Sequence, residues 1–216
     1  MNKCSLSFLS ALSIRKPSRT QLWRASVSEK ETYIMNQKIL LTSAGLQNPH
    51  IGEAFVRMLN KPVSAVKILF IPTAAISAES LRVLCKCIDE LYGVGITAEQ
   101  IVVYSLDRIM SLEEIEKYDA VYVAGGNKTH LLGKVNQVSF APVVKDFVVR
   151  GGLYVGASAG SIPAAMIGMV NCQFTGMHAQ DGSPNGPVDF TTRPEIRLTD
   201  NQALIVDSGE AVVFES

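Results

Sequence analysis

The pentapeptide Gly156-Ala-Ser158-Ala-Gly160 is the clearest candidate for chemistry in this sequence. A short apolar run precedes it, and residues 159–166 fit a helix. A serine on a sharp turn between a strand and a helix has a strained backbone and an exposed hydroxyl. The N–H groups that begin the helix lie beside that hydroxyl and can stabilise an oxyanion. The pattern favours Ser158 as a nucleophile; the other interpretation is a packing turn of small residues.

A second small-residue stretch, Ala124-Gly125-Gly126-Asn127, also follows an apolar run. Two glycines allow a positive φ and let the backbone approach a ligand closely. A backbone N–H of this loop would be the second oxyanion donor, opposite that of Ala159. Asn127 also suits the N-cap of a helix that begins near Lys128, and the two roles are compatible.

A serine nucleophile needs a base, usually a histidine that a carboxylate holds in place. His50 and His130 precede Ser158, and we expect both at the surface or near the ends of helices. His178 is the one histidine downstream, and Asp181 follows it closely. These two residues are therefore the candidate base and acid. The alternative for His178 is a loop histidine without a catalytic role.

Short β-rich runs alternate with helical patterns around these motifs. Alternation of apolar strands with helices predicts a parallel sheet that is covered on both faces by right-handed βαβ units. Functional residues then belong at the carboxyl ends of the strands. The predicted strands are Lys38–Leu41, Lys67–Ile71, Ile101–Tyr104, Ala120–Val123 and Leu153–Gly156. The predicted helices are Gly52–Leu59, Ala78–Tyr92, Ser111–Lys117 and Ala141–Val149.

Composition narrows the class of protein. The chain has 216 residues, 47% of them hydrophobic and 19% charged, which fits one globular domain and excludes general disorder. The formal net charge is zero, so we expect neither a nucleic acid nor an anionic membrane surface as partner. No apolar run reaches the roughly 20 residues of a membrane span. The four cysteines match no zinc-site spacing, and we expect neither a metal nor a cofactor.

The two ends of the chain differ from its middle. Residues 1–34 hold six basic and two acidic residues and no clear period. We expect a disordered or transit-like extension there and a cytoplasmic protein, with targeting to an organelle as the alternative. Residues 35–216 form the expected α/β domain. Residues 166–196 are poorly periodic, and residues 201–215 then predict a β-hairpin around Asp207-Ser208-Gly209-Glu210.

The motifs VAGGN and GGLYVGASAGS resemble the dipeptidase E and cyanophycinase family of serine peptidases. The segments TSAG, ILFIPTAA and LTDNQALIV are also similar to that family. The resemblance implies a class I glutamine amidotransferase-like (flavodoxin-like) fold, a three-layer arrangement of a parallel sheet flanked by helices. It also implies hydrolysis of small peptides, in the best-known members after an N-terminal aspartate, by a monomer or homodimer. It assigns Ser158 as nucleophile, Gly126 and Ala159 as oxyanion donors, and Asn127 to the substrate cleft.

The sequence departs from that family where the base and the acid are expected. The family places a carboxylate and then a Pro-His pair after the nucleophile, whereas this chain has Gln173 and Pro194-Glu195 there. The segment LTDNQ then follows early, so we expect a chain that is shortened near residues 182–198. One hypothesis is an Asp-specific serine hydrolase, and the other is a relative with an incomplete triad, either a binder of small ligands or an inactive variant. A different α/β hydrolase, such as an esterase, fits the flanking motifs less well.

Overall fold

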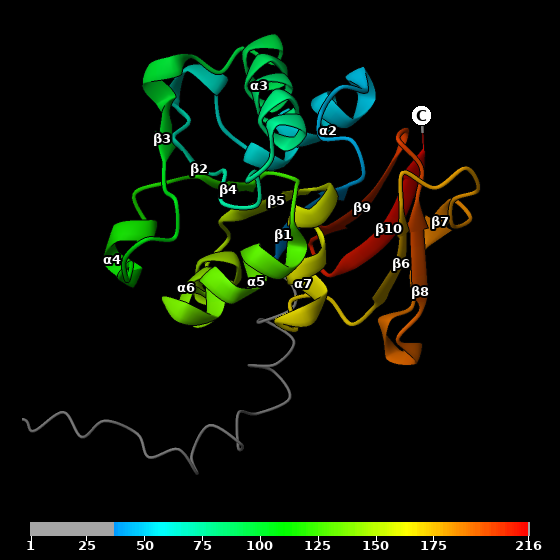
Figure 1. Ribbon diagram of the computed structural model, residues 1–216. Helices are drawn as coiled ribbons and strands as arrows, with labels where there is room; N and C mark the ends of the chain where they lie inside the picture. Colours follow the sequence, from blue (N-terminus) through cyan, green and yellow to red (C-terminus); the bar gives the residue numbers. More distant parts are fainter. Residues whose placement is uncertain (1–36, 216) are drawn as a thin grey trace, which may run out of the picture.

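The computed structural model of the chain describes residues 37–215 (Figure 1). The extension expected over residues 1–34 lies outside these residues. Within them, the architecture is a mostly parallel sheet with helices on both faces, as the sequence predicts.

The larger of two sheets has the strand order β3-β2-β4-β5-β1-β9-β10-β7. The strands from β3 to β1 run parallel to one another, and β9, β10 and β7 each pair in antiparallel fashion. All five predicted parallel strands and the predicted C-terminal hairpin are confirmed. The bounds are β1 Lys38–Thr42, β2 Ile68–Ile71, β3 Ile101–Val103, β4 Ala120–Val123, β5 Leu153–Ala157, β7 Gly186–Pro187, β9 Gln202–Asp207 and β10 Glu210–Glu215.

Helices form a layer on each face of the sheet (Figure 1). In this view α2 (Pro49–Leu59) and α3 (Ala78–Gly93) lie above it, and α5 (Lys128–Gln137), α6 (Phe140–Val149) and α7 (Ile162–Met166) lie below. The short α4 (Leu112–Ile115) follows β3. Single 3₁₀ turns occur at Val63–Ala65, Ala98–Gln100, Ser158–Gly160 (η4) and Phe190–Thr192.

Polar side chains cap several of these helices, which explains where they begin. The side chain of Asn48 accepts the His50 N–H at the start of α2, and Ser77 caps α3 through the Ser80 N–H. Asn127 caps α5 by accepting the His130 N–H at 2.9 Å, as its position after two glycines predicts. Each cap satisfies a backbone donor that the first helical turn leaves without a partner.

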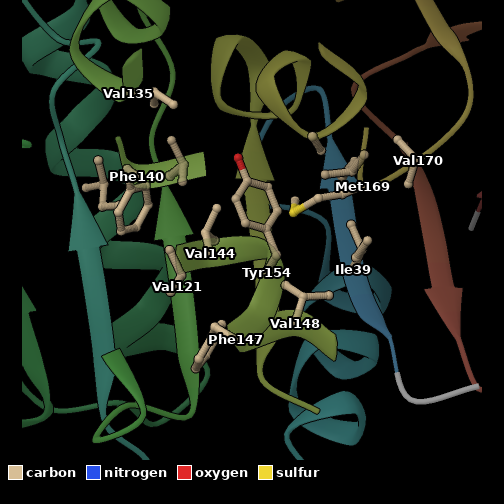
Figure 2. Packing of buried hydrophobic residues seen from close by; sticks show 14 of the residues in the cluster. Ile39, Val121, Val135, Phe140, Val144, Phe147, Val148, Tyr154, Met169 and Val170 are labelled. Carbon is tan, nitrogen blue, oxygen red and sulfur yellow. The ribbon is translucent and has the colours of Figure 1, made fainter. Parts of the chain in front are cut away.

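The core has two parts because successive residues of a strand point to opposite faces. In β1, Ile39 and Leu41 pack on the side of α5, α6 and α7, whereas Leu40 packs on the side of α2 and α3. Figure 2 shows the first of these two clusters, in which the Tyr154 ring lies among aliphatic side chains such as Val144 and Val148. Strands buried on both faces explain the continuous apolar runs in the sequence.

A second sheet forms in the stretch for which the sequence predicts no regular structure. It consists of β6 (Gln173–Met177) and β8 (Glu195–Leu198), which run parallel with an irregularity after Phe174. The side chains of β6 are all exposed or partly exposed, so the strand lacks the apolar alternation that would reveal it. Its pairing with β8 depends on contacts that only the folded chain makes.

Within residues 37–215, no helix has the length and the apolar character of a membrane span. On α3, Cys87 is buried and Cys85 is exposed, because positions two apart on a helix point to different faces. Burial raises the pKa of the Cys87 thiol to about 11, so this thiol is an unreactive part of the core.

The antiparallel β9 is a structural part of the core, which a substitution can test. Leu204 has no exposed surface, so Leu204→Ala should lower the free energy of unfolding by about 2–5 kcal/mol. Val103 on the edge strand β3 is 61% exposed, and Val103→Ala should change the free energy of unfolding by less than about 1 kcal/mol. Urea unfolding followed by circular dichroism measures both values. Equal effects of the two substitutions would contradict this description of the core.

Candidate active site

Ser158 lies at the end of β5 with a backbone φ of 50°. A non-glycine residue in this left-handed region is strained, and surrounding contacts must hold it there. Gly156 and Gly160 make the turn sterically feasible. A Cβ at Gly156 would lie 2.6 Å from the Gly160 carbonyl oxygen, and one at Gly160 would lie 2.0 Å from that of Val123. The strained strand-to-helix turn that the pentapeptide predicts is therefore confirmed.

Ser161 fastens this turn to the neighbouring strand β1. Its Oγ accepts the Thr42 N–H at 3.1 Å and lies 2.8 Å from the Thr42 carbonyl oxygen and 2.7 Å from that of Gly156. Thr42 Oγ1 donates to the Gly156 carbonyl at 3.2 Å and accepts the Gly45 N–H at 3.0 Å. Both side chains are fully buried, so each polar atom needs its partner. This network was not anticipated from the sequence.

The loop after β4 packs directly against Ser158. A Cβ at Gly125 would lie 3.1 Å from the Ser158 Cβ, and one at Gly126 would lie 2.2 Å from the Ala74 carbonyl oxygen. The Asn127 N–H donates to that same carbonyl at 2.7 Å, which pins the loop to the segment after β2. Gly126 has a φ of 137°, and no hydrogen bond among residues 37–215 uses its N–H. That N–H and the one of Ala159 remain candidates for an oxyanion hole.

His178 is the histidine that the fold brings to Ser158. It directly follows β6, and its Nε2 lies 3.2 Å from the Ser158 Oγ. Its backbone N–H donates to the Ser43 hydroxyl at the end of β1, and its φ of 54° turns the chain sharply. The neighbouring Ala179 N–H donates to the Leu198 carbonyl at 3.0 Å. Contacts on both sides of the backbone thus fix the position of the imidazole.

Asp200, and not Asp181, is the carboxylate beside this imidazole. Asp200 Oδ1 lies 2.6 Å from His178 Nδ1. Asp181 is directed elsewhere, because its Oδ1 accepts a hydrogen bond from Arg197 Nη2 at 2.5 Å. The prediction that Asp181 accompanies His178 is therefore corrected by the geometry: proximity in sequence does not bring the two side chains together after the sharp turn at His178. The chain order becomes serine, histidine, aspartate, with the aspartate in the turn before β9.

The two contacts of the His178 ring fit a tautomer with the proton on Nδ1. An ionised carboxylate only accepts hydrogen bonds, so Nδ1 is the donor to Asp200. Nε2 of the neutral ring is then free to accept the Ser158 hydroxyl proton. The His178 and Asp200 side chains are 53% and 50% exposed, so water reaches this pair.

Gln202 holds the turn that carries Asp200. Its buried side chain accepts the Thr199 N–H at 3.2 Å and donates to the Ser183 carbonyl at 2.8 Å. Gly182 lies so close that a Cβ there would be 1.7 Å from Gln202 Oε1. The turn and the segment after His178 are therefore packed as one unit.

The remaining predicted residues have other surroundings. His50 is exposed on α2 with its Nδ1 3.4 Å from Glu53, and His130 lies in the first turn of α5, as expected. Asn127 lines the cleft beside Ser158 while its Oδ1 caps α5, so both of its predicted positions are compatible with the geometry. Glu195, which stands where the related family has its histidine, is the exposed first residue of β8.

A cleft of about 720 Å³ opens beside these residues. Ser158, His178 and Asp200 line one part of it, together with the loops that follow β1 and β4. One face of α3 and the loop before it form another wall of the cleft. The side chains of that wall include Ile76, Ser77, Glu79, Val83, Lys86 and Glu90. A cleft of this size accommodates a short peptide.

Residues 37–215 contain no group of three or more metal-ligating side chains that could hold an ion. The contact between Ser158 Oγ and His178 Nε2 is suited to nucleophilic attack assisted by a general base.

Ser43 and Asp200 were missed from the sequence, although a signal existed for each. Ser43 belongs to the TSAG segment at the end of the first predicted strand, where functional residues are expected. Asp200 lies two residues before β9, and β9 pairs antiparallel with β1 so that Thr42 lies opposite Ala203. Recognising that pairing would have put the start of β9 at the functional edge of the sheet.

Comparisons with known proteins identify a family and a shared fold. The model of peptidase family S51 matches residues 39–181, a range that includes Ser158 and His178 and ends before Asp200. A protein of Listeria monocytogenes EGD-e assigned as a peptidase E has a similar structure, with a TM-score of 0.63 and 17% identity over 83% of this chain and 98% of its own. A peptidase from an acI-B1 Actinobacterium has a TM-score of 0.59 and 15% identity over 85% and 91%. No curated protein matches the sequence.

The glycines of the turn give a test of its packing. Gly160→Ala should lower the free energy of unfolding by about 2–4 kcal/mol or prevent folding, because its Cβ would overlap the Val123 carbonyl. Gly133→Ala is the matched control, since a Cβ there meets nothing within 4 Å on α5. That control should stabilise the protein by about 0.5–1 kcal/mol. Urea unfolding measures both; a Gly160→Ala protein as stable as the control would refute the tight turn.

Proposed function

Since the chain belongs to peptidase family S51, we propose that it is an active serine peptidase that cleaves small peptides. Ser158 is the nucleophile, His178 the general base and Asp200 the carboxylate that orients the base. One observation carries this proposal: His178 lies with one ring nitrogen 3.2 Å from the Ser158 Oγ and the other 2.6 Å from Asp200. The base that the sequence lacks at Pro194-Glu195 is supplied from the end of β6.

The first half of the reaction forms an acyl-enzyme. Ser158 Oγ attacks the scissile carbonyl carbon while its proton passes to His178 Nε2. Asp200 stabilises the imidazolium that results, because it accepts a hydrogen bond from Nδ1. The N–H groups of Gly126 and Ala159 stabilise the oxyanion of the tetrahedral intermediate. The intermediate then collapses, and His178 gives its proton to the departing amine.

The second half regenerates the enzyme with water. A water molecule gives a proton to His178 Nε2 as its oxygen attacks the acyl carbon, and Ser158 recovers that proton as it departs. The half-exposed His178 and Asp200 side chains are consistent with water reaching the acyl group. The strained backbone at Ser158 holds the Oγ clear of the sheet, where both attacking steps occur.

The proposed roles predict how strongly each substitution lowers the catalytic rate. Ser158→Ala and His178→Ala should lower kcat for a short peptide by about 10⁴-fold or more, and Asp200→Asn by about 10³–10⁴-fold. Asp181→Asn is the matched control and should stay within about twofold, because Asp181 pairs with Arg197 outside the cleft. Release of free amino acid, followed by chromatography, measures the rates.

A fluorophosphonate probe tests the nucleophile without knowledge of the substrate. Labelling of the wild-type protein should disappear in Ser158→Ala and weaken strongly in His178→Ala. A folded wild-type protein that is not labelled would favour the alternative, a family relative that binds small peptides without cleaving them. Equal activity of Asp200→Asn and wild type would remove Asp200 from the proposed triad.

We further propose that the preferred substrates carry aspartate before the cleaved bond. The sequence resemblance to dipeptidase E motivates this preference, and the cleft offers one counter-charge for it. Among the cleft-lining residues in the described part of the chain, Lys86 is the one lysine or arginine. An ammonium on this wall attracts a substrate carboxylate.

Lys86 therefore gives a test of substrate preference. Lys86→Met should lower kcat/KM for Asp-Leu relative to Asn-Leu by about three- to tenfold, since an exposed ion pair contributes modestly. Arg82→Met removes a cation from the same helix but outside the cleft, and the ratio should stay unchanged. A wild-type enzyme that cleaves both peptides equally well would contradict the aspartate preference.

A further inference from the structure

Glu90 is an acidic residue in the α3 wall of the cleft that the proposed reaction does not use. It lies near the end of α3 and lines the same cleft as Ser158. Its Oε2 accepts the Leu46 N–H at 2.7 Å, and no hydrogen bond among residues 37–215 uses its Oε1. None of the ion pairs in that range includes Glu90. One carboxylate oxygen is thus available to a ligand.

The charge of Glu90 is poorly compensated by the protein. Burial raises the pKa of this carboxyl group, and the nearby Asp89 acts in the same direction. The Leu46 N–H and Lys86 oppose the shift, but Lys86, one turn earlier on α3, makes no ion pair with Glu90. A half-buried anion without a cationic partner is costly, and a cationic ligand group would relieve that cost.

Neutral polar groups adjoin Glu90. The Tyr122 hydroxyl is fully buried and interacts with the Cys87 thiol. A Cβ at Gly45 would lie 2.4 Å from Glu90 Oε2 and 3.1 Å from this hydroxyl, so the three groups adjoin. The buried Cys87 thiol, with a pKa of about 11, adds no negative charge. Glu90 is therefore the one anion among these groups, and its carboxylate lines the cleft and suits an N–H-rich cation.

The loop after β1 connects this place to the triad. The Ser43 hydroxyl accepts the His178 N–H, and Gly45, two residues later, adjoins Glu90. Two residues span at most about 7 Å, so Glu90 lies near the triad.

We propose that Glu90 is a cation subsite of the cleft that binds an ammonium or guanidinium group of the peptide. Two parts of a peptide supply such a group: the free amino terminus and the side chain of a lysine or arginine. This inference rests on the proposed peptidase function for its choice of ligand, and it extends the substrate class from acidic peptides to peptides that also carry a cation.

Binding to the full chain with Ser158→Ala tests the subsite without requiring turnover. Isothermal titration would compare Asp-Leu with N-acetyl-Asp-Leu, and Asp-Lys with Asp-norleucine. The first pair differs in the charge at the amino terminus, and the second in the charge of a side chain. At least one cationic peptide should bind about tenfold or more tightly than its neutral counterpart. The pair that shows the difference identifies the source of the cation.

Glu90→Gln, added to Ser158→Ala, should reduce that difference to less than about threefold. Glutamine keeps a carbonyl oxygen for the Leu46 N–H, so the loop retains its support. Asp89→Asn is the matched control, since it removes a neighbouring charge that does not line the cleft, and it should leave the difference intact.

The possible results separate the subsite from the catalytic proposal. An unchanged difference in Glu90→Gln, an equal loss for cationic and neutral peptides, or no binding of any of the four peptides would each overturn the cation subsite. If the fluorophosphonate probe did not label wild type but the Glu90-dependent difference in binding were still measured, the peptidase proposal would be rejected and the subsite retained. Cleavage by wild type with no effect of Glu90 on binding would reject the subsite alone.

Discussion

The hydrogen bonds of the buried Ser161 hydroxyl tie together the parts of the molecule on which the site depends. They join the last residue of β1, Thr42, to Gly156 at the base of the turn that carries Ser158. Ser158 is held in a left-handed conformation that an isolated chain would leave. These polar atoms have no access to water. Removing one of them would therefore leave its partners buried without a hydrogen bond, which lowers the free energy of unfolding.

The loop that leaves β1 from this junction serves both the triad and the cleft. Ser43 accepts the backbone N–H of His178, and Leu46 donates to the carboxylate of Glu90. A single short segment therefore positions the proposed base and one wall of the substrate site. Thr42 and Ser43 are fully buried and hydrogen-bonded, which holds the start of this segment in place.

The C-terminal part of the chain completes the site with structure of its own. His178 follows the end of β6, and the turn with Asp200 follows the end of β8. Because β6 and β8 are parallel, both residues lie at the same end of the pair. Gln202 fastens that turn to the segment after His178. A triad is defined by geometry and not by the order of its members along the chain, so the order Ser158, His178, Asp200 is compatible with the proposed chemistry.

The sequence alone determined the parallel sheet, the turn at Ser158 and the glycine loop before Asn127. These features are encoded locally, by apolar runs and by glycines where a Cβ would meet neighbouring backbone. His178 could be singled out because no other histidine follows Ser158. Only the tertiary structure decided its carboxylate partner. Asp181 is closer in sequence, but the antiparallel pairing of β9 with β1 and the pairing of β6 with β8 bring Asp200 to the imidazole. Such pairings depend on contacts between distant segments, which no local pattern around either aspartate records.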